Sequence, residues 1–190
     1  MRIVSDDVIL RDMTESDIPD YVRWFTEETR WGDLDAPWEP IASDEESEKN
    51  SWSEYYARVK DRPEDAPRWK FEIEWNGRHI GWVSSYDIDE AFEWTDKGSD
   101  RLAVGIDICE PEAWGRGVGA KALSAFIGYL FERGEERVYT QTWSGNERMV
   151  RCAKKLGFTE CDRRAALREV DGKRFDALTF VLQRGQKPIC

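Results

Sequence analysis

The chain has 190 residues, of which 35% are charged and 40% hydrophobic, an ordinary balance for one soluble globular domain spanning residues 1–190. No apolar stretch approaches the roughly 18–20 residues that cross a bilayer, and the acidic start does not form a secretory signal, so we expect a cytoplasmic protein with no membrane partner. The net charge of −11 weighs against nucleic acid as a partner, because phosphate binding uses clustered lysine and arginine.

The charge is divided unevenly along the chain. Residues 1–100 carry a net charge of −15 and residues 101–190 a net charge of +4. Solvated helix faces are one explanation; the other is that the first half faces a cationic substrate and the second half an anionic one. The four cysteines and the single His79 show none of the close spacings of a zinc site, so we expect reduced thiols and no metal.

The first predicted elements are a short strand over 8–11 and two helices. One helix begins near Thr14 and Asp17, and its apolar residues then recur at helical spacing. The second follows Ser43 and Glu46, which stand in capping-box register.

The later segments alternate strands with helices. Two strands turn at Asn76-Gly77, which is the strongest short-range hairpin signal, and a last hairpin turns at Asp171-Gly172. Between the two hairpins we predict a strand over 101–110, a helix over 116–133, a strand over 136–143 and a helix over 146–156. This order predicts a mixed sheet of the α/β or α+β class with flanking helices.

The loop between the strand near residue 108 and the next helix reads Gly115-Arg116-Gly117-Val118-Gly119-Ala120. Backbone amides that no side chain covers, at the start of a helix, bind anionic oxygens. The unpaired N–H groups and the positive end of the helix dipole both face such an anion. Arg116 adds a positive charge. The spacing fits neither a dinucleotide fingerprint nor a Walker loop, so we expect a different phosphate ligand.

Two segments together resemble the acetyl-coenzyme A signatures of the GNAT N-acetyltransferase superfamily, in particular the branch that acetylates ribosomal-protein N-termini. "WGRGVGAKAL" matches the first signature at Gly117 and Gly119, with Trp114 where glutamine or arginine is usual. "SGNERMVRCAKKLGF" matches the second signature at Asn146, Lys155, Gly157 and Phe158. A narrower likeness is to aminoglycoside 6′-N-acetyltransferases, through Gly105-Ile106-Asp107 and the residues after Gln141-Thr142.

The resemblance implies a mostly antiparallel seven-stranded sheet and acetyl-coenzyme A as cosubstrate, without metal. It implies that the strand around 106–110 separates from the strand around 139–143, and that a backbone N–H near Ile108 or Cys109 polarises the acetyl carbonyl. Asp107 is the candidate general base. The alternative role, an aspartate that only caps or positions a neighbouring group, fits the sequence equally well. The expected coenzyme-binding residues are Ile108, Cys109, Arg116, Gly117, Val118, Gly119, Ala120 and Asn146.

The acceptor side of the site is expected to be aromatic and acidic, which suits a cationic amine. The expected acceptor residues are Trp24, Trp31, Trp82, Tyr86 and Trp143, with Trp38, Glu72, Glu74 and Asp87 as further candidates. The alternative is that most of these rings build the core. The 30–42 segment is expected to close over the acceptor.

Two departures from the family pattern limit the resemblance. Ala153 stands where the family has a tyrosine that protonates the leaving sulfur, so Cys152, Ser144 or water would have to replace it. Trp143 stands where the aminoglycoside enzymes have an acid. We expect transfer of acetyl from acetyl-coenzyme A to a primary amine of a small cationic molecule or a protein N-terminus, by direct attack in a ternary complex. An acyl-coenzyme A binder with weak catalysis, an aminoglycoside acceptor and a homodimer remain open alternatives.

Overall fold

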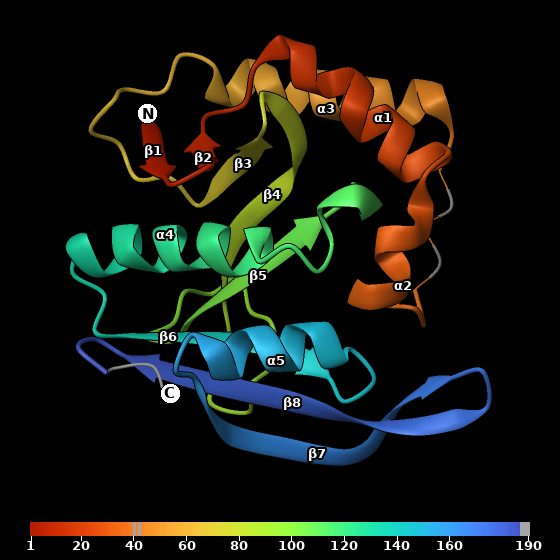
Figure 1. The fold of residues 1–190 in the computed structure, drawn as a ribbon, viewed down its shortest axis with the longest axis vertical. Helices are drawn as coiled ribbons and strands as arrows, with labels where there is room; N and C mark the ends of the chain where they lie inside the picture. Colours follow the sequence, from red (N-terminus) through yellow and green to blue (C-terminus); the bar gives the residue numbers. More distant parts are fainter. Residues whose placement is uncertain (40, 42, 187–190) are drawn as a thin grey trace.

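The computed structural model describes residues 1–39, 41 and 43–186, and its centre is one mixed sheet (Figure 1). The sheet has eight strands in the order β1-β2-β3-β4-β5-β6-β8-β7, and only the β5–β6 pair is parallel. The strands are β1 Arg2–Ser5, β2 Val8–Arg11, β3 Lys70–Trp75, β4 Arg78–Asp87, β5 Leu102–Ile108, β6 Arg137–Trp143, β7 Thr159–Val170 and β8 Lys173–Gln183. The mixed fold class is thus confirmed.

The expected strand number was one too low, because β1 was not anticipated. Ser5 pairs with Val8, so β1 and β2 form a hairpin with a two-residue turn at Asp6 and Asp7. Asp6 takes a φ of 53° there, a conformation that aspartate tolerates better than most residues. The Asn76-Gly77 and Asp171-Gly172 hairpins are confirmed, and both residues of each turn have positive φ.

Helices cover both faces of the sheet. They are α1 Ile18–Thr26, α2 Gly32–Asp35, α3 Glu45–Val59, α4 Val118–Glu132 and α5 Glu147–Lys155, with short 3₁₀ turns η1 Glu15–Asp17, η2 Thr29–Trp31 and η3 Pro111–Ala113. The expected cap of α3 was wrong by one residue: the Asp44 side chain, rather than that of Ser43, accepts the Ser47 N–H at 2.9 Å. None of the helices in the described residues is long and apolar enough to cross a membrane.

Two packed regions lie on opposite sides of the strands. The larger core packs α4 residues such as Leu123 and Phe126 against Phe71, Val83 and Val104 of the sheet. The smaller one is an aromatic cluster under α1 and α3, whose buried and partly buried rings are Tyr21, Trp24, Phe25, Trp31, Trp52, Tyr55, Tyr56, Trp82 and Trp114. Residues opposite each other in an antiparallel pair share a face, so Trp82 and its partner Asp107 both point to the side of this aromatic cluster.

The expectation of free thiols holds for three cysteines. Cys109, Cys152 and Cys161 are unbridged, and Cys190 lies outside the described residues.

Candidate functional site

The site begins where β5 and β6 separate. Their parallel pairing is limited to Leu102 with Val138 and Ala103 with Tyr139, after which the strands run apart (Figure 1). The Thr140 hydroxyl donates to the Val104 carbonyl oxygen at 2.8 Å just beyond the last pair. The separation that the resemblance implies is therefore confirmed, and it leaves backbone groups of β5 without a strand partner on the β6 side. One of them, the Ile108 carbonyl oxygen, accepts the Trp114 indole N–H at 2.8 Å.

A cavity of about 900 Å³ occupies this opening. It is lined by four consecutive residues of β5, Gly105 to Ile108. Because successive strand residues face opposite sides, a cavity that contacts all four reaches both faces of the sheet. A ligand in it can therefore extend from the α4 and α5 side through the opening to the side of the aromatic cluster.

The glycine loop forms one wall of this cavity. Gly115 and Gly117 have φ of 75° and 80°, and an added Cβ at either would meet nothing within 4 Å, so the backbone conformation rather than crowding calls for glycine. Gly117 is the N-cap of α4 and offers no side-chain acceptor, so the first N–H groups of the helix lack a side-chain partner. Gly119 and Ala120 also line the cavity.

Two residues of the same loop lie elsewhere. Arg116 donates through Nε to the Glu112 carbonyl oxygen at 2.6 Å, and its guanidinium lies 5.9 Å from the centre of the Trp75 ring. Val118 is buried in the main core. Neither is among the residues that line the cavity, in contrast to Gly115, Gly117 and Gly119.

Positive charge at the cavity comes instead from α5, whose cations were not among the expected coenzyme-binding residues. Arg148, Arg151 and Lys155 line the cavity from one face of this helix. Their spacing of three and four residues is the signal that would have placed them on one face. The Arg148 guanidinium lies 4.7 Å from the centre of the Trp114 ring, which holds it near the glycine loop. The α4 and α5 end of the cavity is therefore basic.

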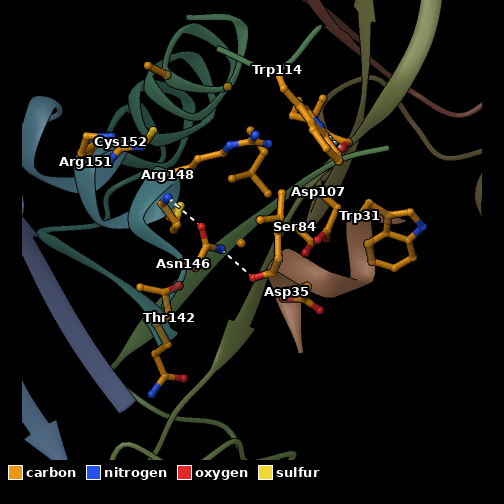
Figure 2. A pocket seen from close by; sticks show the side chains of 18 of the residues that line it. Trp31, Asp35, Ser84, Asp107, Trp114, Thr142, Asn146, Arg148, Arg151 and Cys152 are labelled. Atoms are coloured by element: carbon orange, nitrogen blue, oxygen red, sulfur yellow. Dashed lines mark hydrogen bonds between the residues drawn. The ribbon is translucent and has the colours of Figure 1, made fainter. Parts of the chain in front are cut away.

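Asn146 joins the basic end to the α2 segment (Figure 2). Its Oδ1 caps α5 by accepting the Met149 N–H at 2.9 Å, while its Nδ2 donates to the Leu34 carbonyl oxygen at 2.7 Å. The Trp143 indole donates to the same carbonyl at 3.0 Å. Asn146 and Trp143 thus fix the position of Leu34; Asn146 also lines the cavity, whereas Trp143 does not.

The opposite end of the cavity is acidic and aromatic. Asp35, Glu39 and Asp107 line it together with Trp31, Tyr86 and Trp94. Burial, with the nearby Asp35 carboxylate, raises the pKa of Asp107 well above its ordinary value, while Lys70 opposes this shift. The Asp35 side chain is exposed, but partial desolvation and the nearby Glu39 carboxylate also raise its pKa. A carboxylate with a raised pKa is a stronger base than an ordinary aspartate.

Of the residues expected at the acetyl group, Cys109 lies outside the cavity. Its N–H donates to the Ile80 carbonyl oxygen at 2.8 Å, so the expectation that this N–H binds an acetyl oxygen is not supported. Its side chain is 1% exposed in the aromatic cluster, and burial raises the pKa of the thiol well above the ordinary value. Strand donors alternate in direction, so the Ile108 N–H points to the open β6 side.

The expected acceptor aromatics divide between wall and core. Trp31 and Tyr86 line the cavity. Trp24 and Trp82 are buried in the aromatic cluster, where the Trp24 indole donates to Glu110 at 3.0 Å. The 30–42 segment does form part of the wall, with Pro40 and Ala42 outside the described residues.

The other expected acceptor candidates lie outside this cavity. Glu72 is buried between Tyr21 and His79, and Glu74 forms an ion pair with Arg11 at 3.0 Å. Trp38 packs on Trp143, with a distance of 6.0 Å between the ring centres, and Asp87 is not among the lining residues.

Comparison with known proteins places this architecture in a family. Residues 7–159 match the family model described as an acetyltransferase (GNAT) domain. The fold is similar to ribosomal-protein-alanine N-acetyltransferase from Brucella melitensis, with a TM-score of 0.64, 20% identity, and coverage of 92% of this chain and 98% of that one. It is also similar to Mycobacterium smegmatis RimJ in complex with CoA-disulfide, with a TM-score of 0.70, 19% identity and coverage of 96% and 85%.

A third solved structure, the ribosomal L7/L12 alpha-N-protein acetyltransferase RimL in complex with coenzyme A, has a TM-score of 0.72 and 15% identity, with coverage of 96% of this chain and 98% of that one. Identities this low establish a shared fold. The aminoglycoside likeness drawn from the sequence has no counterpart among these structures.

Proposed function

Because the chain belongs to the GNAT acetyltransferase family, we propose that it transfers the acetyl group of acetyl-coenzyme A to a primary amine of a small cationic molecule or a protein N-terminus. The observation that carries this proposal is the cavity through the β5–β6 opening, which is basic at one end and acidic at the other. An anionic cosubstrate suits the first end and an ammonium group the second.

The residues at the basic end fit the coenzyme. The bare amides at Gly117 and Gly119 suit its pyrophosphate, because they stand at the N-terminus of a 15-residue helix. Arg148, Arg151 and Lys155 add charge for the phosphates. The unpaired β5 edge suits the amides of the pantetheine arm, which would pair with it as an added strand does.

Asp107 is proposed as the base that makes the acceptor amine neutral. An alkyl ammonium has a pKa near 10, so only about one part in a thousand is a free amine at neutral pH. Asp107 takes a proton from the ammonium, the amine nitrogen then attacks the thioester carbonyl carbon, and the carbon–sulfur bond breaks. The Ile108 N–H is the proposed donor to the oxyanion, a contribution of about 3–4 kcal/mol when such a donor is well placed.

The leaving thiolate has no tyrosine to protonate it, since Ala153 is fully buried in the main core. Cys152 lines the cavity one residue earlier, and burial raises the pKa of its thiol to about 11. This thiol stays protonated at neutral pH and is a weak proton donor. The proposed reaction therefore relies on release of the coenzyme as thiolate, and solvent supplies the final proton.

The test is release of the coenzyme thiol from acetyl-coenzyme A with three acceptors: an alanine-initiated peptide, an aminoglycoside and spermidine. We expect turnover with at least one of them, and a loss of about 100-fold or more in kcat/KM for Asp107→Asn with unchanged coenzyme affinity by calorimetry. Activity of the parent should fall as the pH is lowered through the raised pKa of Asp107. The missing tyrosine favours the second candidate function, an acyl-coenzyme A binder, which would give tight coenzyme binding and no turnover with any amine.

A further inference from the structure

The short helix α2 brings a second carboxylate to the cavity. Asp35 follows Leu34, whose carbonyl oxygen accepts hydrogen bonds from Asn146 at 2.7 Å and Trp143 at 3.0 Å. These donors come from the N-cap of α5 and the end of β6, more than 100 residues further along the chain. Asp35 is therefore placed on the cavity wall by side chains from the far side of the opening.

Asp35 and Asp107 differ from the other acids of this half of the molecule. Asp17 pairs with Arg11 at 2.7 Å, and Glu110 pairs with Arg23. Within residues 1–39, 41 and 43–186, neither Asp35 nor Asp107 forms an ion pair with a lysine, arginine or histidine. The two carboxylates line one cavity from different elements (Figure 2), and the positive charge that faces Asp107 is that of Lys70, which is not close enough to form an ion pair.

We infer that Asp35 binds the ammonium group of the acceptor and holds it beside Asp107, so that the two carboxylates divide the work of binding and deprotonation. This inference rests on the proposed function and adds a residue that neither the family resemblance nor the sequence motifs identify. Asp35 keeps its charge while Asp107 takes one proton of the ammonium. After attack, the amide keeps one of the three ammonium protons, Asp107 passes the proton it took to solvent, and the nitrogen loses the third proton to solvent. Solvent then protonates the coenzyme thiolate, so that one proton is released overall.

The charges around Asp107 make these separate roles of Asp35 and Asp107 testable, because they set the pKa of Asp107. The titratable groups that face it are Asp35 from α2, Lys70 from β3, Tyr86 from β4 and Cys109 from the residue after β5. The Trp82 side chain also hydrogen-bonds Asp107 and lowers its pKa. Asp35 raises the pKa of Asp107 and Lys70 lowers it. Removal of the Asp35 charge should therefore move the acid limb of the kcat/KM profile to lower pH, whereas Lys70→Met should move it to higher pH.

The experiment compares Asp35→Asn with Asp33→Asn, a matched variant on the same short helix. Both side chains are exposed, but only Asp35 is among the cavity-lining residues. With the best acceptor of the amine panel, we expect Asp35→Asn to lower kcat/KM by roughly tenfold, mainly through KM, and to shift the acid limb downward. Asp33→Asn should match the parent, and coenzyme affinity should be unchanged in both.

Two outcomes would overturn the inference. One is an Asp35→Asn profile that superimposes on that of Asp33→Asn. The other is a lower kcat/KM for Asp35→Asn with an acid limb at the same pH as in the parent. That result would show that Asp35 only supports the packing of the cavity wall. If the parent turns over no amine, the proposed function fails first, and calorimetry of spermidine and of the alanine-initiated peptide with the coenzyme A-bound protein decides the inference separately: equal affinity for the parent and Asp35→Asn would refute it.

Discussion

Asn146 connects α5 at the basic end of the cavity with α2 at the acidic end. Its replacement by alanine removes two hydrogen bonds, one to the Met149 N–H and one to the Leu34 carbonyl oxygen. Loss of the cap on the Met149 N–H should cost about 1 kcal/mol in the free energy of unfolding. Loss of the bond to the Leu34 carbonyl should cost about 1 kcal/mol more. The carbonyl keeps the Trp143 indole as a partner, so no further penalty for a buried unpaired acceptor is expected.

Asn146→Ser separates the two contributions. Serine caps a helix about as well as asparagine but has no amide to reach Leu34. For a chain of this size, 1 kcal/mol corresponds to about 2–4 °C in the melting temperature. Calorimetric melting should therefore show a decrease of about 4–8 °C for Asn146→Ala and about half of that for Asn146→Ser.

The acceptor kinetics of the same two variants test the positioning of Asp35. Both should raise the KM for the amine, because both release Leu34 and with it the neighbouring Asp35. Equal melting temperatures for Asn146→Ser and the parent would show that the link to α2 contributes no stability. A normal acceptor KM in a destabilised Asn146→Ser protein would show that the link does not position Asp35.

Two further predictions concern the coenzyme end and the buried histidine. Gly119→Glu should weaken coenzyme A binding by roughly 100-fold in calorimetry, because it places a carboxylate against the phosphates. The control Gly119→Ala should bind coenzyme A normally, since its Cβ would lie an ordinary 3.7 Å from Ile106. Equal affinities of the two variants for coenzyme A would contradict the phosphate site. Burial alone would lower the pKa of His79, but hydrogen bonds with Asp20 and Glu72 raise it to about 9. The folded state therefore binds the proton more tightly, and this contribution to stability, about 3 kcal/mol, is present below pH 6.5 and lost as the pH rises to about 9. Urea unfolding of the parent and His79→Gln across this range should show the parent losing its advantage, and parallel curves would contradict the assignment.

The parts of the fold that the sequence predicted are those set by local chemistry. Asn76-Gly77 and Asp171-Gly172 form hairpin turns because both residues of each accept positive φ. The glycine loop was recognised in the same way, from residues adjacent in the chain. Strand β1 was missed because its turn at Asp6 uses an aspartate pair without glycine, and the segment has only four residues.

The parts of the site that could not be predicted depend on contacts between distant segments. Asp35 reaches the cavity through donors on Asn146 and Trp143, which no local pattern reveals. The direction of the Cys109 N–H follows from which neighbour strand β5 pairs with, and the resemblance left Ile108 and Cys109 as alternatives. The basic face of α5 was readable from its spacing, but only the β5–β6 opening shows that this face borders a cavity.

The net charges of residues 1–100 and 101–190 explain only part of the charge distribution in the cavity. The acidic first half supplies Asp35 and Glu39, and the basic second half supplies the α5 cations, as the division at residue 100 predicts. Most acids of the first half, however, lie outside the cavity or are neutralised, as Asp17 is by Arg11. Asp107, which lies in the second half, joins the acidic end because the cavity crosses the sheet beside β5. The polarity of the site therefore follows from which cavity-lining carboxylates form no ion pair among the described residues, rather than from the net charge of either half.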